Sequence, residues 1–317
     1  MRTAPKLALV LPCYNEEVVL PATAQSLLGV LKTLVAQGQI DTESFVYFVD
    51  DGSQDQTWSI IQALHQKTPA IKGLKLAHNC GHQNALLAGL LGARGRADCA
   101  ISLDADLQHD EHAIPAFVEQ FRAGADIVFG VRNDRSTDGV LKKFSALCFY
   151  GLMRLMGVNV LKNHADYRLV SARALDALAE YREVNLFLRG VFATMGFRTS
   201  VVHFNVKPRF AGESKYSLRK MLSLAIGGIT SFSIVPLRLI AALGFVIFVA
   251  SIAMSAYVLY IALTSVDAVP GWASTVLPIY FIGGVQLLSI GLLGEYVGRI
   301  YQETKARPRF LKDHEIF

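Results

Sequence analysis

Two long apolar stretches near the end of the chain constrain its fold more than any other feature. Residues 239–266 and 268–294 contain no Asp, Glu, Lys or Arg. Each stretch is long enough to cross the hydrocarbon core of a bilayer, which is about 30 Å thick. The mean hydropathy of +0.35 is also high for a soluble protein. We therefore predict a C-terminal two-helix transmembrane hairpin over residues 237–298. A buried helical hairpin in a soluble protein is the alternative.

Positive charge beside these stretches predicts their orientation. The whole net charge of +5 comes from the residues that begin at Val206. The expected turn between the spans, around Asp267 and Trp272, has no positive charge, whereas Arg238 precedes the hairpin and a basic tail (299–317) follows it. The positive-inside rule then places both termini in the cytoplasm. The same charges suit membrane lipids or a phosphate-bearing substrate. No basic-aromatic groove motif supports a nucleic acid partner.

The first half of the chain has the pattern of an α/β fold with a mostly parallel sheet. Short apolar runs at 7–11, 45–49, 71–76, 99–103 and 126–130 alternate with helical patterns at 18–36, 57–66, 83–94 and 114–122. Ligands of such sheets bind at the carboxyl ends of the strands. Residues 140–160 and 217–236 are amphipathic, and we expect them to lie along the membrane surface, with core-facing helices as the alternative.

Polar motifs follow three of the predicted strands. Pro12, Tyr14 and Glu16 follow the first strand, and Asp51 with Gly52 follows the second. Either turn alone indicates little, because Asp-Gly-Ser turns are common in plain loops. Their position at neighbouring strand ends makes them candidate ligand contacts.

Asp104 and Asp106 follow the fourth predicted strand. Alternate residues of an extended segment project to the same side, so the two carboxylates converge. Hard oxygen ligands suit Mg²⁺ or Mn²⁺ held together with substrate phosphates. An Asp-x-Asp motif by itself is more often a solvated turn. After an apolar strand, and downstream of the other two motifs, it indicates a metal site.

Together these residues resemble family 2 glycosyltransferases with the GT-A fold, a Rossmann-like α/β architecture with a mostly parallel sheet. The resemblance is to polyprenyl-phosphate glycosyltransferases of the bactoprenol glucosyltransferase and dolichol-phosphate mannose synthase type. It covers almost the whole chain and includes residues 79–85, 130–135, 166–168, 209–216 and 294–299. It implies a cytoplasmic catalytic domain over residues 1–216, a juxtamembrane helix at 217–236 and two spans like those of the bactoprenol type.

The resemblance also implies roles for individual residues. Pro12, Tyr14, Glu16 and Asp51 are expected around the base and ribose of the donor, and Asp104, Asp106 and Gln108 at the metal and diphosphate. Asp166 matches a position near the sugar pocket, where it orients a hydroxyl or acts as a base. A cap or a salt bridge to Arg168 is the alternative for Asp166. From their place beside these motifs, His82 and His109 are expected as polar loop histidines near phosphate, with a base or a ligand as the alternative. Many relatives have two prolines after the Asp-x-Asp, where this chain has residues 109–112 instead.

Four cations in two matching loops are expected to bind the acceptor phosphate. They are Arg132, Arg135, Arg209 and Lys215, beside Gly130 and Gly212. Arginine binds phosphate oxygens through paired donors and lysine adds a point charge. The alternative is that these are surface charges held near lipid headgroups.

The predicted reaction is the inverting transfer of a hexose from a nucleotide diphosphate-sugar to polyisoprenyl (undecaprenyl) phosphate, for cell-envelope glycosylation at a bacterial inner membrane. Glucose from UDP-glucose is the first choice, with GDP-mannose, galactose, N-acetylhexosamine or modified arabinose donors as alternatives. A processive polysaccharide synthase is disfavoured because the chain lacks a Gln-x-x-Arg-Trp motif. The non-enzymatic alternative is a membrane transporter or scaffold that only binds nucleotide. The paired Gly283 and Gly284 suggest helix packing in a homo-oligomer.

Overall fold

The computed structural model describes residues 4–106, 108–133, 164–184, 186–205, 235–264 and 272–317. The predicted amphipathic segment 140–160 lies outside these residues, as do 217–234 of the predicted juxtamembrane helix. Three of the four predicted acceptor cations, Arg135, Arg209 and Lys215, also lie outside them. The predicted turn around Asp267 also lies outside the described residues.

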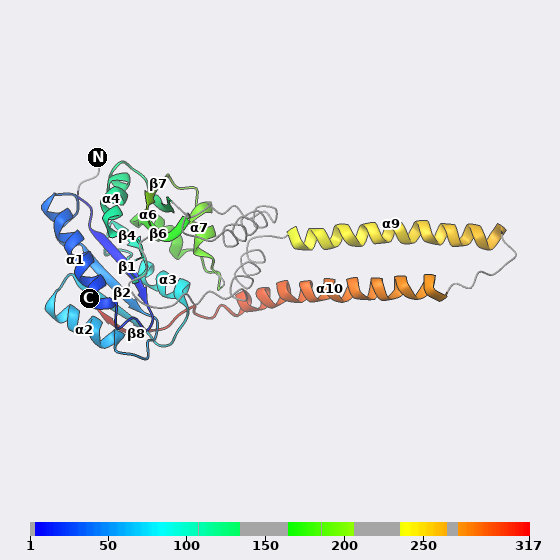
Figure 1. Ribbon diagram of the computed structural model, residues 1–317, viewed down its shortest axis with the longest axis horizontal. Coiled ribbons are helices and arrows are strands. Elements are labelled where there is room, and N and C mark those ends of the chain that lie inside the picture. Colours follow the sequence, from blue (N-terminus) through cyan, green and yellow to red (C-terminus); the bar gives the residue numbers. More distant parts are fainter. Residues whose placement is uncertain (1–3, 107, 134–163, 185, 206–234, 265–271) are drawn as a thin grey trace.

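The described residues form one eight-stranded sheet in the order β7-β5-β6-β4-β1-β2-β3-β8 (Figure 1). Strands β1 to β4 pair in parallel, and β5 pairs in parallel with β7. Strand β6 is antiparallel to both β4 and β5, and β8 is antiparallel to β3. The predicted mostly parallel sheet is therefore confirmed. The strand bounds are β1 (Leu7–Cys13), β2 (Phe45–Asp50), β3 (Ile71–Leu76), β4 (Cys99–Ser102), β5 (Ile127–Arg132), β6 (His164–Ser171), β7 (Thr199–Phe204) and β8 (Lys312–Ile316).

Helices cover both faces of the sheet and build one core on each (Figure 1). Helices α1 (Leu20–Ala36), α2 (Thr57–Lys67) and α4 (Ile114–Arg122) pack on one face, and α3 (His82–Ala93), α6 (Ala172–Ala179) and α7 (Leu188–Thr194) on the other. Along β1, Leu9 faces the first core and Val10 the second. All of β1 is buried, which explains why its sequence is continuously apolar rather than alternating.

The predicted basic tail contains a strand of the sheet. Helix α10 (Trp272–Lys305) ends within this tail, and the chain then returns to the sheet, where β8 pairs with the edge strand β3. The Tyr47 hydroxyl donates to Glu315 Oε1 at 2.7 Å. The Phe317 ring packs edge-on against Phe45, with 5.0 Å between ring centroids. The last residues of the chain therefore cover an edge that would otherwise present unpaired backbone groups.

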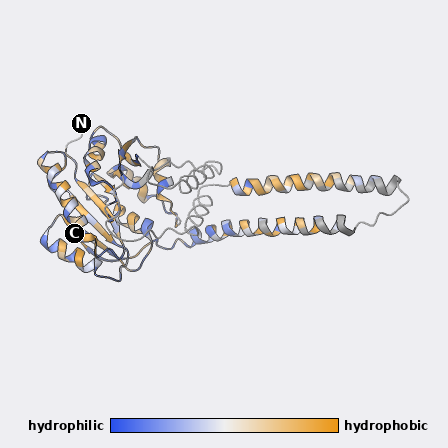
Figure 2. Cartoon of the chain, viewed as in Figure 1, coloured by the Kyte–Doolittle hydropathy of each residue, from blue (hydrophilic) through white to orange (hydrophobic). Residues whose placement is uncertain are grey.

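Helices α9 (Val235–Thr264) and α10 extend side by side away from the sheet (Figure 1). Apolar residues run along both helices (Figure 2). Large apolar side chains on them are exposed, with Phe245 at 66% and Leu287 at 73%. Among the described residues, one segment, Phe281–Lys305, is long and apolar enough to span a bilayer, judged by length and composition alone. The two-span hairpin stays a prediction.

Candidate functional site

A cleft of about 480 Å³ opens at the carboxyl ends of β1, β2, β4 and β5. Every predicted site residue that the structure describes lines it. These residues are Pro12, Tyr14, Glu16, Asp51, Asp104, Asp106, Gln108, Arg132 and Asp166. The fold therefore brings five separate segments of the sequence to one place, although the individual roles of these residues stay predictions.

The turns after β1 and β2 are joined by hydrogen bonds. The Asn15 N–H donates to Ser53 Oγ at 3.0 Å, and the Glu16 N–H donates to Thr57 Oγ1 at 2.9 Å. Asn15 has a φ of +53°, a conformation that asparagine tolerates better than most residues. These contacts fix the backbone of the segment that carries Tyr14, whose side chain is 42% exposed at the cleft.

Asp51 holds the loop that leads into α3. Its Oδ1 accepts the Cys80 N–H at 2.7 Å and its Oδ2 accepts the Gly81 N–H at 2.9 Å. Burial raises the pKa of Asp51, and these two N–H groups oppose that rise. Next to it, Gly52 has a φ of +67°, and a Cβ there would lie 2.6 Å from the backbone carbon of His78. Asp51 therefore shapes the cleft wall through backbone contacts, and its predicted contact with the donor stays a prediction.

Hydrogen bonds to buried side chains hold the backbone of the Asp-x-Asp loop. The Asp104 N–H donates to His109 Nδ1 at 3.1 Å, so a neutral His109 carries its proton on Nε2, 3.6 Å from Asp104 Oδ2. Burial lowers the pKa of His109, which favours that neutral form. From α1, the buried Thr23 hydroxyl donates to the Ala105 carbonyl at 2.8 Å. His109 was expected as a polar loop residue, but its side chain is buried and stacks on Tyr167.

Asp166, on β6, lies between two guanidinium groups. Arg168 Nη2 donates to its Oδ1, while Arg189 donates from Nε to Oδ1 at 3.1 Å and from Nη2 to Oδ2 at 2.7 Å. Burial alone would raise the pKa of Asp166, but Arg168 and Arg189 hold it well below its ordinary value. A carboxylate that binds protons so weakly is a poor general base. This favours the hydroxyl-orienting role over the base, and the alternative salt bridge to Arg168 is also present.

Sequence reasoning missed Arg189. It lies on α7, lines the cleft and binds both carboxylate oxygens of Asp166. Its only sequence signal is its place as a lone charge in the apolar run 186–192. A charged residue in such a run calls for a buried partner, although the sequence does not say which one.

The carboxylates at the cleft suit a divalent metal that is bound together with a diphosphate. Asp104 and Asp106 line the same cleft, and the Gln108 N–H donates to Asp106 Oδ1 at 3.1 Å. Within the part of the chain that the structure describes, no group of three or more His, Cys, Asp and Glu is arranged around one metal position. Magnesium is commonly held by one or two carboxylates, with phosphates and water completing its shell. Two carboxylates are therefore sufficient when the substrate supplies the other ligands.

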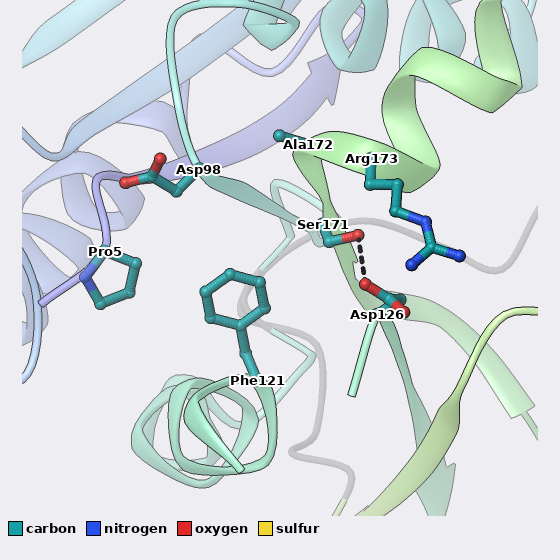
Figure 3. A pocket seen from close by; sticks show the side chains of 7 residues that line it. All are labelled: Pro5, Asp98, Phe121, Asp126, Ser171, Ala172 and Arg173. Atoms are coloured by element: carbon teal, nitrogen blue, oxygen red, sulfur yellow. Dashed lines mark hydrogen bonds between the residues drawn. The ribbon is translucent and has the colours of Figure 1, made fainter. Parts of the chain in front are cut away.

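A second cavity, of about 390 Å³, lies at the opposite ends of the strands (Figure 3). Its carboxylates already accept hydrogen bonds within the protein. Asp98 Oδ2 accepts the Lys6 N–H at 2.8 Å, and Asp126 Oδ1 accepts the Ser171 hydroxyl at 3.2 Å. These contacts join the beginnings of β1 and β5 to neighbouring strands, which is a structural role.

Comparison with known proteins gives a consistent result. The profile of Glycosyl transferase family 2 matches residues 8–178. The chain is 45% identical over 316 residues to the uncharacterized glycosyltransferase YkoT of Bacillus subtilis (strain 168), covering 100% of this chain and 94% of that protein. It is 40% identical over 310 residues to a bactoprenol glucosyl transferase of Shigella phage SfX, covering 96% and 98%.

Among solved structures, glucosyl-3-phosphoglycerate synthase from Mycobacterium tuberculosis, in complex with Mn²⁺, UDP-glucose and phosphoglyceric acid, matches with a TM-score of 0.45. The identity is 17%, and the match covers 71% of this chain and 78% of that chain. The family match includes Asp51, Asp104 and Asp166 but ends before Arg189.

Proposed function

The chain belongs to glycosyl transferase family 2, and from that premise we propose that it transfers a hexose, with inversion, from a nucleotide diphosphate-sugar to a polyisoprenyl phosphate. The cleft where Asp104, Asp106 and Asp166 meet carries this proposal. Similarity over nearly the full length to a bactoprenol glucosyl transferase supports a glucosyl group as the sugar and a prenyl phosphate as the acceptor. UDP-glucose is the proposed donor and undecaprenyl phosphate the proposed acceptor. GDP-mannose and modified arabinose donors are the alternatives that a panel of sugar nucleotides would separate.

The donor lies along the strand ends. Pro12, Tyr14, Glu16 and Asp51 form the wall for the base and ribose. Asp104, Asp106 and Gln108 hold the diphosphate with Mg²⁺ or Mn²⁺. When bound, the metal neutralises charge that develops on the leaving nucleoside diphosphate. Thr23 and His109 keep the Asp104 loop in place, so little reorganisation is needed during the reaction.

The acceptor phosphate enters from the side of Arg132, which lines the cleft at the end of β5. Arg135, Arg209 and Lys215 complete this pocket in the proposal. A phosphate monoester has a second pKa of about 6, so the nucleophile is already largely ionised near neutral pH. No general base is then required, in keeping with the depressed pKa of Asp166. One phosphate oxygen attacks the sugar carbon opposite the leaving diphosphate, which inverts that carbon.

Asp104→Ala and Asp106→Ala test the metal and diphosphate site. Each should lower transfer at least about 100-fold, because neutralisation of the leaving group is lost. The assay is transfer from labelled UDP-glucose to a short prenyl phosphate by the purified full chain, with metal and with EDTA. Glu119→Ala, an exposed carboxylate on α4, is the control. Full activity in either Asp variant, or transfer that EDTA leaves unchanged, would contradict the assignment.

The membrane arrangement is also part of the proposal. Helices α9 and α10 anchor the protein in the bacterial inner membrane, with the catalytic domain and both termini cytoplasmic, and the exposed apolar side chains on both helices support this. The arrangement includes a homo-oligomer packed at Gly283 and Gly284. Ser274→Cys, in a background without the native cysteines, should react with an impermeant reagent added outside the cell. Protection of this cysteine would contradict the two-span topology.

A further inference from the structure

Asp166 has a hydrogen-bonding capacity that the described residues nearly fill. Two carboxylate oxygens offer about four acceptor positions. Arg168 takes one on Oδ1, and Arg189 takes one on each oxygen. Within the described part of the chain, one position is left on Oδ2. This oxygen lies 3.9 Å from His82 Nε2, and that same nitrogen lies 3.5 Å from Asp104 Oδ1. The remaining acceptor position is therefore close to the expected metal and diphosphate.

The two arginines act on Asp166 in different ways. Arg168 is fully buried and reaches one oxygen from the same strand. Arg189 comes from α7, keeps 33% of its side chain exposed and grips both oxygens. A guanidinium that binds both oxygens fixes the rotation of the carboxylate plane, which is otherwise a soft torsion. Arg189 therefore sets the direction in which Oδ2 accepts a hydrogen bond.

The start of α7 is itself tied to the cleft. The Leu188 N–H donates to Gln83 Oε1 at 3.2 Å, which connects α7 to the first turn of α3. His82, in the same turn, lies between Asp104 and Asp166. The start of α7 is thus linked to the expected sites of both the diphosphate and the sugar.

We propose that Arg189 is a positioning residue that orients Asp166 so that its Oδ2 accepts a hydroxyl of the donor sugar. The inference rests on the proposed function, and it adds a residue beyond the part of the chain that the family profile matches. The competing role is a direct contact between Arg189 and the donor diphosphate. The two roles predict different losses of binding when Arg189 is replaced. In the first role only the nucleotide-sugar binds more weakly, whereas in the second the nucleotide-sugar and the free nucleoside diphosphate are weakened equally.

Titration calorimetry of the purified full chain with UDP-glucose and with UDP, both with Mn²⁺, separates these roles. Arg189→Gln should weaken UDP-glucose binding at least about tenfold, the lower limit expected for one hydrogen bond to a charged group. It should leave UDP binding within about twofold. Arg189→Lys should show the same selective loss, because lysine keeps the charge but not the paired donors. Arg94→Gln, which breaks the Arg94–Asp176 ion pair outside the cleft, should change neither affinity.

Equal losses for UDP and UDP-glucose would overturn the proposal in favour of a diphosphate contact. Unchanged binding of UDP-glucose in either Arg189 variant would also overturn it. Arg189→Lys keeps the test decisive if Arg189→Gln does not fold. A wild-type protein that binds UDP-glucose but transfers nothing to prenyl phosphate would refute the proposed function. The role of Arg189 is decided separately, by how much each Arg189 variant loses in affinity for UDP-glucose compared with UDP.

Discussion

Asp166→Asn should destabilise the protein because it removes the counterion of a buried cation. The Arg168 side chain is fully buried, and its Nε and Nη1 have no hydrogen-bond partner among the described residues. Removing one partner of a buried ion pair costs about 3–5 kcal/mol. Asparagine keeps one acceptor oxygen, and the partly exposed Arg189 regains water, so we expect the lower end, about 3 kcal/mol. For a domain of this size, that lowers the unfolding midpoint by about 6–12 °C.

The pH dependence of this difference follows from the direction of the pKa shift. Asp166 has a lower pKa in the folded protein than in the unfolded chain. Its stabilisation is therefore fully present above the unfolded value of about 3.9 and is lost as pH falls through the folded value. The gap between wild type and Asp166→Asn should stay constant from about pH 5 to 8 and narrow only below about pH 4.

Thermal unfolding of the purified full chain in detergent measures this gap. Asp176→Asn is the matched control, because Asp176 pairs with Arg94 at 2.6 Å but is 59% exposed. An exposed ion pair contributes at most about 1 kcal/mol, so the control should lose less than about 4 °C. If Asp166→Asn melts within about 2 °C of the wild type, the buried Arg168 does not depend on Asp166 and the reasoning fails.

Two further substitutions test the loop after β2 and the C-terminal strand. Gly52→Ala should weaken UDP-glucose binding at least about tenfold, because the added Cβ would lie 2.6 Å from loop backbone. Gly38 is the control: it has a similar positive φ, but a Cβ there would meet no atom within 4 Å, so Gly38→Ala should bind UDP-glucose normally. Glu315→Ala should cost about 1–3 kcal/mol in unfolding experiments, because the buried Tyr47 hydroxyl loses its acceptor. Lys312→Ala removes the 3.3 Å ion pair between Lys312 and the same Glu315 but leaves the Tyr47 hydrogen bond in place. Equal losses in the two variants would contradict this assignment.

The sequence alone determined the central strands and the helices between them. Strand β3 and helix α4 have the predicted bounds, and the other strands and helices predicted before residue 133 differ by one or two residues at their ends. This accuracy has a physical cause: helices cover both faces of the parallel strands, so these strands must be apolar throughout. The same constraint orders the motifs, because parallel strands bring their carboxyl ends to one edge. Asp104 and Asp106, which follow an apolar strand, therefore line the cleft as predicted, and their role at a metal stays a prediction.

Tertiary structure decided the rest. Strand β6 is central in the sheet, yet it carries Asp166 and Arg168, and a strand with buried charges does not have an apolar pattern. Strand β8 consists largely of charged residues and becomes a strand only because the edge of β3 offers unpaired backbone groups. Arg189 joins the cleft through a contact with Asp166 that no local spacing encodes. Local patterns specify what each segment buries, whereas pairing between distant segments depends on which groups the folded chain leaves without a partner.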